Sequence, residues 1–213
     1  MSPGLFITFE GIEGSGKSTQ LAHLRTYLQE QGLEVVSVRE PGGTAIGNRI
    51  RGLLLDPEAV DMTDEAEVML FAAARSQLVR QVVLPALTRG TIVLCDRYLH
   101  SSIAYQGWAR ELGREAVLKV NRLATAGLLP HKVVLIDLPV ETALRRAKAR
   151  AGLDRIERED ILFHEAVRRG YLAEQAWDPQ RFVLIDGDQP EDDIQGEIRK
   201  HLDPAIAAMG LES

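Results

Sequence analysis

Five short runs of mostly apolar residues recur along the chain, and longer segments with helical periodicity separate them. Most of these runs are continuously apolar, which is typical of strands that helices cover on both faces. Strands that alternate with helices predict a parallel sheet with right-handed crossovers. Because no repeat and no Pro/Gly-rich linker divides the chain, the pattern predicts one α/β domain over residues 1–213, with a five-stranded parallel sheet flanked by helices. The expected strands are Leu5–Glu10, Val35–Val38, Thr91–Cys95, Val133–Leu138 and Arg181–Ile185.

Two segments between the strands have informative local signals. The helical pattern Thr63–Arg89 begins with Thr63, a good N-cap residue, and acidic residues follow it. Pro85 is expected to kink or end the last turns of this helix, because proline lacks an amide hydrogen. The segment Arg150–Arg158 is highly charged, contains a glycine and lies between two helical patterns. Composition alone fits a mobile flap and a solvated connection between helices equally well.

Charge and hydropathy narrow the class of protein. The chain has 25 Lys and Arg residues against 31 Asp and Glu residues, a net charge of −6. This balance argues against duplex nucleic-acid binding, whereas a small phosphorylated ligand needs only a local cluster of basic residues. No apolar run approaches the ~20 residues that span a bilayer, and Met1–Phe9 enters an expected strand without a basic segment. We therefore expect a cytoplasmic protein with no membrane or nucleic-acid partner. The single cysteine, Cys95, is expected to be a small buried hydrophobe.

A phosphate-binding loop follows the first expected strand. Residues 11–18 (Gly-Ile-Glu-Gly-Ser-Gly-Lys-Ser) match the pattern G-x-x-x-x-G-K-[ST], and an amphipathic helix follows. Glycines let the backbone approach phosphate, and backbone N–H groups at the helix N-terminus hold its oxygens. Lys17 is expected to neutralise charge on the β- and γ-phosphates, and the Ser18 hydroxyl to ligate Mg²⁺. The motif predicts nucleotide binding without specifying the reaction. The expected ATP-binding residues here are Gly11, Ile12, Glu13, Gly14, Ser15, Gly16, Lys17, Ser18 and Thr19.

Several charged or aromatic residues are expected near the carboxyl ends of the strands, where ligands collect in parallel sheets. Asp96 ends the third strand and is a candidate metal ligand, although a strand-terminal salt bridge is the alternative. Arg97 follows it and indicates a second anion site. Phe71 and Arg75 share a helix face and could receive a base and its phosphate, or serve as a core aromatic and a surface arginine. Arg39 lies in a glycine-containing loop after the second strand, which could also be a simple turn.

Three sequence blocks accompany the phosphate-binding loop in a fixed order. They are residues 39–44 (Arg-Glu-Pro-Gly-Gly-Thr), residues 71–75 (Phe-Ala-Ala-Ala-Arg) and residues 96–106 (Asp-Arg-Tyr-Leu-His-Ser-Ser-Ile-Ala-Tyr-Gln). Together with the loop, these blocks resemble the signature of the thymidylate kinase family, from about Leu5 to Ile185. The resemblance implies a P-loop nucleoside monophosphate kinase that transfers the γ-phosphoryl group of ATP to dTMP. It also implies Mg²⁺ dependence, a homodimer, and a role in dTTP supply for DNA synthesis.

The same resemblance implies acceptor-binding roles for individual residues. Phe71 would stack on thymine, and Arg75 and Arg97 would bind the dTMP phosphate. Glu13 would contact the 3′-hydroxyl or the groups around it, and Tyr105 would crowd the 2′ position and disfavour ribose. The further residues expected around the phosphate, base or sugar are Arg39, Ser101, Ser102 and Gln106.

Members of the family differ in where a catalytic arginine lies. Some carry it in the phosphate-binding loop, but the corresponding residue here is Gly14. The resemblance therefore implies the bacterial type, in which a flexible lid, here about residues 146–158, supplies the arginine. Arg150 and Arg155 are the candidate catalytic residues, while Arg146 is expected to pack on the adenine of ATP.

The implied acceptor is a phosphate oxygen, which is already largely ionised near neutral pH and needs no strong general base. Catalysis is therefore expected from positioning and charge compensation. His100 and His164 are expected to be solvated or capping residues. A deoxynucleoside kinase would instead need a base near the 5′-hydroxyl and less positive charge at the acceptor site. A nucleotide-dependent switch would leave the second anion site unexplained, and the chain has no clear guanine-reading N-K-x-D motif.

Overall fold

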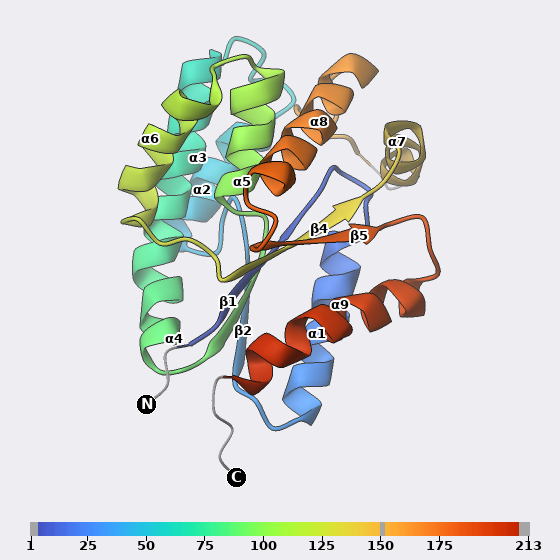
Figure 1. Ribbon diagram of the computed structural model, residues 1–213. Helices are drawn as coiled ribbons and strands as arrows, with labels where there is room; N and C mark the ends of the chain where they lie inside the picture. The colour runs from blue at the N-terminus through green and yellow to red at the C-terminus, as the bar shows by residue number, and fades with distance from the viewer. Residues whose placement is uncertain (1–3, 150–151, 209–213) are drawn as a thin grey trace.

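The structure, a computed structural model, describes residues 4–149 and 152–208 (Figure 1). At its centre lies a five-stranded sheet in the order β2-β3-β1-β4-β5, in which every pair is parallel. The predicted P-loop α/β fold class is confirmed, and each expected strand is present within one residue of its predicted bounds. The strands are β1 (Phe6–Glu10), β2 (Val35–Arg39), β3 (Ile92–Asp96), β4 (Lys132–Asp137) and β5 (Phe182–Asp186).

Helices join the strands, and two of the helical segments have π-type hydrogen bonding. The α-helices are α1 (Lys17–Glu30), α2 (Ala45–Leu55), α3 (Asp64–Leu78), α4 (Leu84–Thr88), α5 (Leu99–Ser102), α6 (Arg114–Thr125), α7 (Val140–Lys148), α8 (Ile161–Trp177) and α9 (Glu191–Ala207). The π-helical segments are η1 (Val79–Val83) and η2 (Ile103–Ala109). None of the helices in the described part of the chain is long and apolar enough to cross a membrane.

The long helical pattern predicted from Thr63 onward is divided into α3, η1 and α4. Thr63 is the N-cap as predicted, since its hydroxyl accepts a hydrogen bond from the Ala66 N–H at 3.3 Å. Pro85 lies in the first turn of α4, directly after the π-helical turn. The helix therefore changes its hydrogen-bonding pattern next to the residue that cannot donate, and then continues to Thr88.

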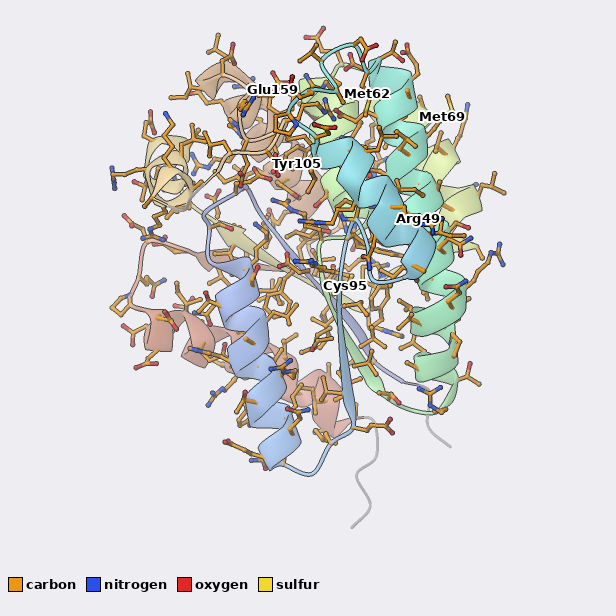
Figure 2. All side chains as sticks on the ribbon, turned by 180° about the vertical axis from the view of Figure 1, so that it is seen from behind. Arg49, Met62, Met69, Cys95, Tyr105 and Glu159 are labelled. Carbon is orange, nitrogen blue, oxygen red and sulfur yellow. The ribbon has the colours of Figure 1, made fainter. Side chains whose placement is uncertain are left out.

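Both faces of the sheet are covered, which explains why the strands are continuously apolar. Helices α1 and α9 cover one face, and α3, α4, α6 and α8 pack over the other (Figure 1). Leu24 of α1 and Ile198 of α9 belong to the first of these cores, together with Leu94 of β3. Cys95, the next residue of β3, lies in the opposite core near the centre of the molecule (Figure 2). It is fully buried, as predicted.

Backbone hydrogen bonds join the carboxyl ends of β1, β2 and β3. The Arg97 N–H donates to the Phe9 carbonyl at 2.9 Å, and the Glu40 N–H donates to the Asp96 carbonyl at 2.9 Å. Three loops that are far apart in sequence therefore leave the sheet side by side. This edge is where ligands collect in parallel α/β proteins, and it forms the base of the site described next.

Candidate active site

A cleft of about 650 Å³ opens at the carboxyl edge of the sheet. Fifteen of the sequence-predicted site residues line it, and they are spread between positions 13 and 146 of the chain. They are Glu13, Gly14, Gly16, Lys17, Ser18, Thr19, Arg39, Phe71, Asp96, Arg97, Ser101, Ser102, Tyr105, Gln106 and Arg146. The predicted residues Gly11, Ile12, Ser15, Arg75 and Arg155 are not part of this lining. Arg150 lies outside the described residues.

The phosphate-binding loop has the backbone conformation that its glycines permit. Gly11, Gly14 and Gly16 have φ angles of 139°, 79° and 96°, and helix α1 starts directly after Gly16. The Lys17 ammonium donates to the Ile12 carbonyl at 2.7 Å and lies 3.4 Å from the Ser15 hydroxyl. Burial and the nearby positive charge of Arg97 lower the pKa of Lys17 to about 8, although the carboxylates of Asp96, Glu13 and Glu10 act in the opposite direction. An anionic ligand at the loop would favour the charged form of this lysine.

Gly14 has no room for a side chain. Its φ is positive, and a Cβ at this position would collide with the Ala143 carbonyl of helix α7. An arginine at this place would need both a strained backbone and a displaced helix. The geometry therefore agrees with the expectation that any catalytic arginine comes from another segment.

Two oxygen-bearing side chains converge beside the loop. The Ser18 hydroxyl donates to the Asp96 carboxylate, with 2.5 Å between the oxygens. Hydroxyl and carboxylate oxygens are the hard donors that Mg²⁺ prefers, so the pair fits this ion. Within the described residues, no group of three or more His, Cys, Asp or Glu side chains could hold a metal.

Arg97 is the most constrained basic residue of the cleft. Its φ of 71° is in the left-handed region, which is uncommon for a residue with a side chain. One guanidinium nitrogen, Nη1, donates to the Gly11 carbonyl, the Ser101 hydroxyl and the Tyr171 hydroxyl at 2.9, 3.2 and 2.9 Å. The other, Nη2, forms a 2.6 Å ion pair with Glu13. The guanidinium is therefore held on the cleft wall close to the phosphate-binding loop.

Glu13 links the loop to the opposite wall. The Tyr105 hydroxyl donates to its carboxylate at 2.6 Å, and the Arg97 guanidinium lies 5.2 Å from the centre of the Tyr105 ring. Burial raises the pKa of Glu13, but the Arg97 and Lys17 charges outweigh it, so the net shift is downward. Glu13 is thus an ionised carboxylate between the loop and the aromatic side chain.

The two histidines near these motifs are buried, and other residues cap their helices, so the expectation of solvated or capping side chains was wrong. His100 is buried and packs edge-on against Phe182, and burial lowers its pKa to about 3. His164 on α8 has 0% exposure, and neither ring nitrogen has a hydrogen-bond partner. Its Nδ1 lies 3.8 Å from the Glu13 carboxylate. Both rings are buried by elements that tertiary folding brings around them, which the sequence near each histidine did not specify.

Arg75 does not lie where a phosphate ligand was predicted. Its side chain is 1% exposed and pairs with the equally buried Glu40 at 2.5 Å. The remaining donors bind the Ser102 hydroxyl, the Asn121 amide oxygen and the Tyr98 carbonyl. Its guanidinium hydrogens are taken up by protein groups, so the geometry corrects the phosphate-binding role. Arg75 instead braces Ser102, which lines the cleft.

Another arginine takes a place in the cleft that the sequence reasoning missed. Arg51 on α2 lines the cleft together with Arg39, and its Nη1 donates to the Pro41 carbonyl at 3.1 Å. Burial and the nearby Arg39 charge lower the pKa of Arg51, which shows two basic groups close together in a partly desolvated site. A signal was available, because Arg51 is on the helix that directly follows the predicted loop 39–44.

Arg155 lies behind the cleft wall. Its Nη2 pairs with Glu67 of α3 at 2.5 Å, and its Nε donates to the Leu54 carbonyl at 3.1 Å. The other Glu67 carboxylate oxygen accepts from the cleft residue Gln106 at 2.8 Å. The next residue, Ile156, is buried in the core that contains Tyr105. In this conformation the second half of the predicted lid is therefore packed against α2 and α3.

Residues 146–148, at the start of the predicted lid, belong to helix α7. Arg146 lies in the last turn of this helix. It lines the cleft, and its guanidinium donates to the Gly187 carbonyl at 3.2 Å and to Asp188 at 3.3 Å. This position at the rim, beside the phosphate-binding loop, is compatible with the expected adenine contact, which stays a prediction.

Fold and cleft together define a P-loop phosphotransferase. One wall of its cleft, called the donor wall, is the phosphate-binding loop, and the facing wall consists of basic and aromatic side chains. Residues 9–198 match the family model described as thymidylate kinase. The chain is 48% identical over 198 residues to a thymidylate kinase of Deinococcus radiodurans, which covers 93% of this chain and 96% of the relative. It is 49% identical over 195 residues to one of an Exiguobacterium species, covering 92% of each. The chain belongs to the thymidylate kinase family.

Proposed function

We propose that this protein transfers the γ-phosphoryl group of ATP to dTMP, giving dTDP and ADP for dTTP synthesis. The observation that carries the proposal is that Arg39, Arg51 and Arg97 line the same cleft as the phosphate-binding loop with its Lys17. Two anionic groups must be brought together against their mutual repulsion for phosphoryl transfer between phosphates. An uncharged acceptor would not need three arginines in the same cleft as the loop.

In the proposed mechanism the protein contributes positioning and charge. Lys17 and the backbone of the loop hold the β- and γ-phosphates of ATP, and Arg97 holds the acceptor phosphate in line with them. Ser18 and Asp96 are the proposed ligands of Mg²⁺, which neutralises charge on the phosphate oxygens of bound ATP. The acceptor oxygen is already ionised, so no side chain has to remove a proton.

The other end of the cleft supplies the proposed nucleoside site. Phe71 is partly buried on α3 and offers a ring face for stacking, while Ser102 and Gln106 offer buried polar groups for the base edge. Glu13 and Tyr105 form the pair proposed to lie against the sugar. A ribose 2′-hydroxyl would crowd the Tyr105 ring, which favours a deoxyribose.

The proposed catalytic arginine comes from the segment after α7. Arg155 can reach the cleft only if it leaves Glu67, and Arg150 is the other candidate from the sequence. If one of them stabilises the transferred phosphoryl group, Arg→Ala lowers kcat more than it raises the KM for dTMP, by up to ~10³-fold. Steady-state kinetics of Arg150→Ala and Arg155→Ala test this. Turnover near the wild-type value in both variants would remove the lid arginine from the mechanism.

One assay tests the proposed function as a whole. ADP release should be measured with purified protein, ATP and Mg²⁺, in parallel reactions with dTMP, dUMP, UMP, CMP, thymidine and no acceptor. We expect the largest kcat/KM with dTMP and little release without an acceptor. A preference for thymidine would indicate a deoxynucleoside kinase. ADP release at the same rate with and without an acceptor would indicate an ATPase or a switch protein. Either result would overturn the proposal.

We also propose a cytoplasmic homodimer without nucleic-acid or membrane partners. The α2 and α3 helices pack together and expose the apolar side chains Ile46, Leu53 and Met69, and Met69 lies on the outer surface in Figure 2. Covering these side chains with a second copy would remove apolar surface from water. Size-exclusion chromatography with light scattering should give twice the chain mass for the wild type, and Met69→Lys should shift it toward the monomer. A wild-type monomer would refute the dimer.

A further inference from the structure

A buried polar cluster lies beneath the Arg97 side chain, and the mechanism above leaves it without a role. Its members are Glu10 at the end of β1, Ser101 on α5, and Tyr171 on α8. Glu10 is 0% exposed and Tyr171 is 1% exposed. A carboxylate in such a position is costly unless its neighbours satisfy it. The cluster therefore needs an explanation beyond packing.

Glu10 accepts hydrogen bonds from both hydroxyls. The Ser101 hydroxyl donates to Oε2 of Glu10 at 2.6 Å, and the Tyr171 hydroxyl donates to the same oxygen at 3.2 Å. The two hydroxyl oxygens also lie 2.7 Å from each other. Each hydroxyl has only one proton, and a carboxylate that only accepts draws these protons toward itself.

The lone pairs of the same hydroxyls face Arg97. Nη1 of Arg97 donates to the Ser101 oxygen at 3.2 Å and to the Tyr171 oxygen at 2.9 Å. A hydroxyl can accept from a guanidinium only if its own proton points elsewhere. The Glu10 carboxylate accepts those protons in hydrogen bonds. It therefore orients each hydroxyl so that a lone pair of its oxygen faces Arg97.

Glu10 also supports the backbone of the arginine. Its Oε1 accepts from the Tyr98 N–H at 2.8 Å, directly after Arg97, whose φ is 71°. Backbone in this region persists only when the surroundings hold it. One carboxylate thus fixes both the turn that carries Arg97 and the hydroxyls that contact its guanidinium.

We propose that Glu10 is a positioning residue, which orients the Arg97 guanidinium toward the acceptor phosphate through Ser101 and Tyr171. The inference rests on the proposed function, because it assigns Arg97 to the phosphate of the acceptor. It also places α8, the helix that follows the predicted lid, in contact with the anion site through Tyr171. No contact with substrate is required of Glu10 itself.

Thymidine and dTMP differ only in the phosphate. Comparing their affinities therefore distinguishes a loss of Arg97 positioning, which affects dTMP alone, from a general disruption of the site, which affects both. The Kd of each should be measured by calorimetry at pH 8, above the pKa of about 7 that burial gives Glu10. The proteins compared are the wild type, Glu10→Gln and Glu34→Gln, an exposed control with the same chemical change. We expect Glu10→Gln to weaken dTMP binding by ~10-fold while thymidine binding changes by less than ~2-fold. The Glu34→Gln control should match the wild type. Equal losses for both ligands, or no loss for either, would overturn the inference.

Tyr171→Phe provides a second variant that keeps the aromatic ring. It removes one hydroxyl between Glu10 and Arg97, so it should also weaken dTMP binding more than thymidine binding. The loss of dTMP affinity in the double variant should be smaller than the product of the two single fold-changes. If Glu10→Gln does not fold, an unchanged ratio of dTMP to thymidine affinity in Tyr171→Phe refutes the inference. Wild-type protein without dTMP-dependent ADP release would instead refute the proposed function, so the two failures are distinguishable.

Discussion

The donor and acceptor walls of the cleft are built in different ways. The proposed donor wall is one continuous loop with its following helix, in which Gly14, Gly16 and Lys17 line the cleft. The acceptor wall is assembled from side chains on separate elements, with Arg39 after β2, Arg51 on α2 and Arg97 after β3. Buried groups such as Glu10 and Tyr171 hold part of this wall in place. Backbone recognition thus needs one local conformation, whereas side-chain recognition needs a supporting network.

Two arginines of the acceptor side show what this difference means. Arg97 has one face on the cleft, while Arg75 is enclosed by Glu40, Ser102 and other protein groups. Both were expected to bind phosphate, and the tertiary contacts of each guanidinium separate their roles. The chemistry of an arginine in this region therefore follows from what already occupies its hydrogen-bond donors.

The largest expected effect concerns the donor wall. Lys17→Ala should lower kcat for dTMP-dependent ADP release by at least ~10³-fold, because the charge next to the β- and γ-phosphates is lost. The variant should keep its helical circular dichroism spectrum. Lys119→Ala, at an exposed position of α6, is the matched control and should remain fully active. Activity of Lys17→Ala within ~10-fold of the wild type would break the assignment of the donor wall.

Replacing Arg75 should reveal its structural role. Arg75→Met leaves Glu40 buried without its partner, a change that costs about 3–5 kcal/mol of unfolding free energy. Adding Glu40→Gln should recover part of the loss, and Arg80→Met at an exposed position should have little effect. Urea unfolding followed by circular dichroism measures these values. A fully stable Arg75→Met protein with weak dTMP binding would restore the phosphate role and contradict the contrast with Arg97.

The ionisation of Glu10 should appear in the pH dependence of stability. Burial raises the pKa of Glu10 from 4.5 to about 7, although the hydrogen bond from Ser101 and the positive charge of Arg97 act in the opposite direction. Between these values the native state binds more protons than the unfolded state, so this residue makes stability fall as pH rises from about 4.5 to 7. The full effect is at most about 3 kcal/mol.

Urea unfolding at several pH values tests this contribution. The difference in unfolding free energy between the wild type and Glu10→Gln should change in favour of the variant as pH rises through this range. A difference that is independent of pH would show that Glu10 has the same protonation state in the folded and unfolded chain.

The smallest expected effect concerns Arg51, one of the arginines of the proposed acceptor wall. Arg51→Met should raise the KM for dTMP by about 10- to 100-fold with a smaller change in the KM for ATP, as expected for one lost charged contact to phosphate. Arg49→Met is the control, since Arg49 is on the same helix and exposed on the outer surface (Figure 2). If the KM for ATP rises instead, Arg51 belongs to the donor wall and the division between the walls has to be redrawn.

The sequence by itself determined the sheet, the phosphate-binding loop and the order of the motifs. Apolar runs and glycine spacing are local properties, and each expected strand lies within one residue of its predicted bounds. The signature blocks also placed Phe71, Asp96 and Arg97 correctly at the cleft. These features depend on the chain near each residue and on the rule that parallel strands gather their carboxyl ends at one edge.

Tertiary structure alone decided the partners of the charged side chains. The pairing of Arg75 with Glu40, the contact between Arg155 and Glu67, and the entry of Arg51 into the cleft join residues from different elements. Local patterns cannot specify such contacts, because an arginine has a long, flexible side chain and five donors that many distant groups can satisfy. The burial of His164 and Glu10 likewise depends on how helices pack over the sheet. Electrostatic roles in this protein are therefore set by the three-dimensional neighbourhood of each charge.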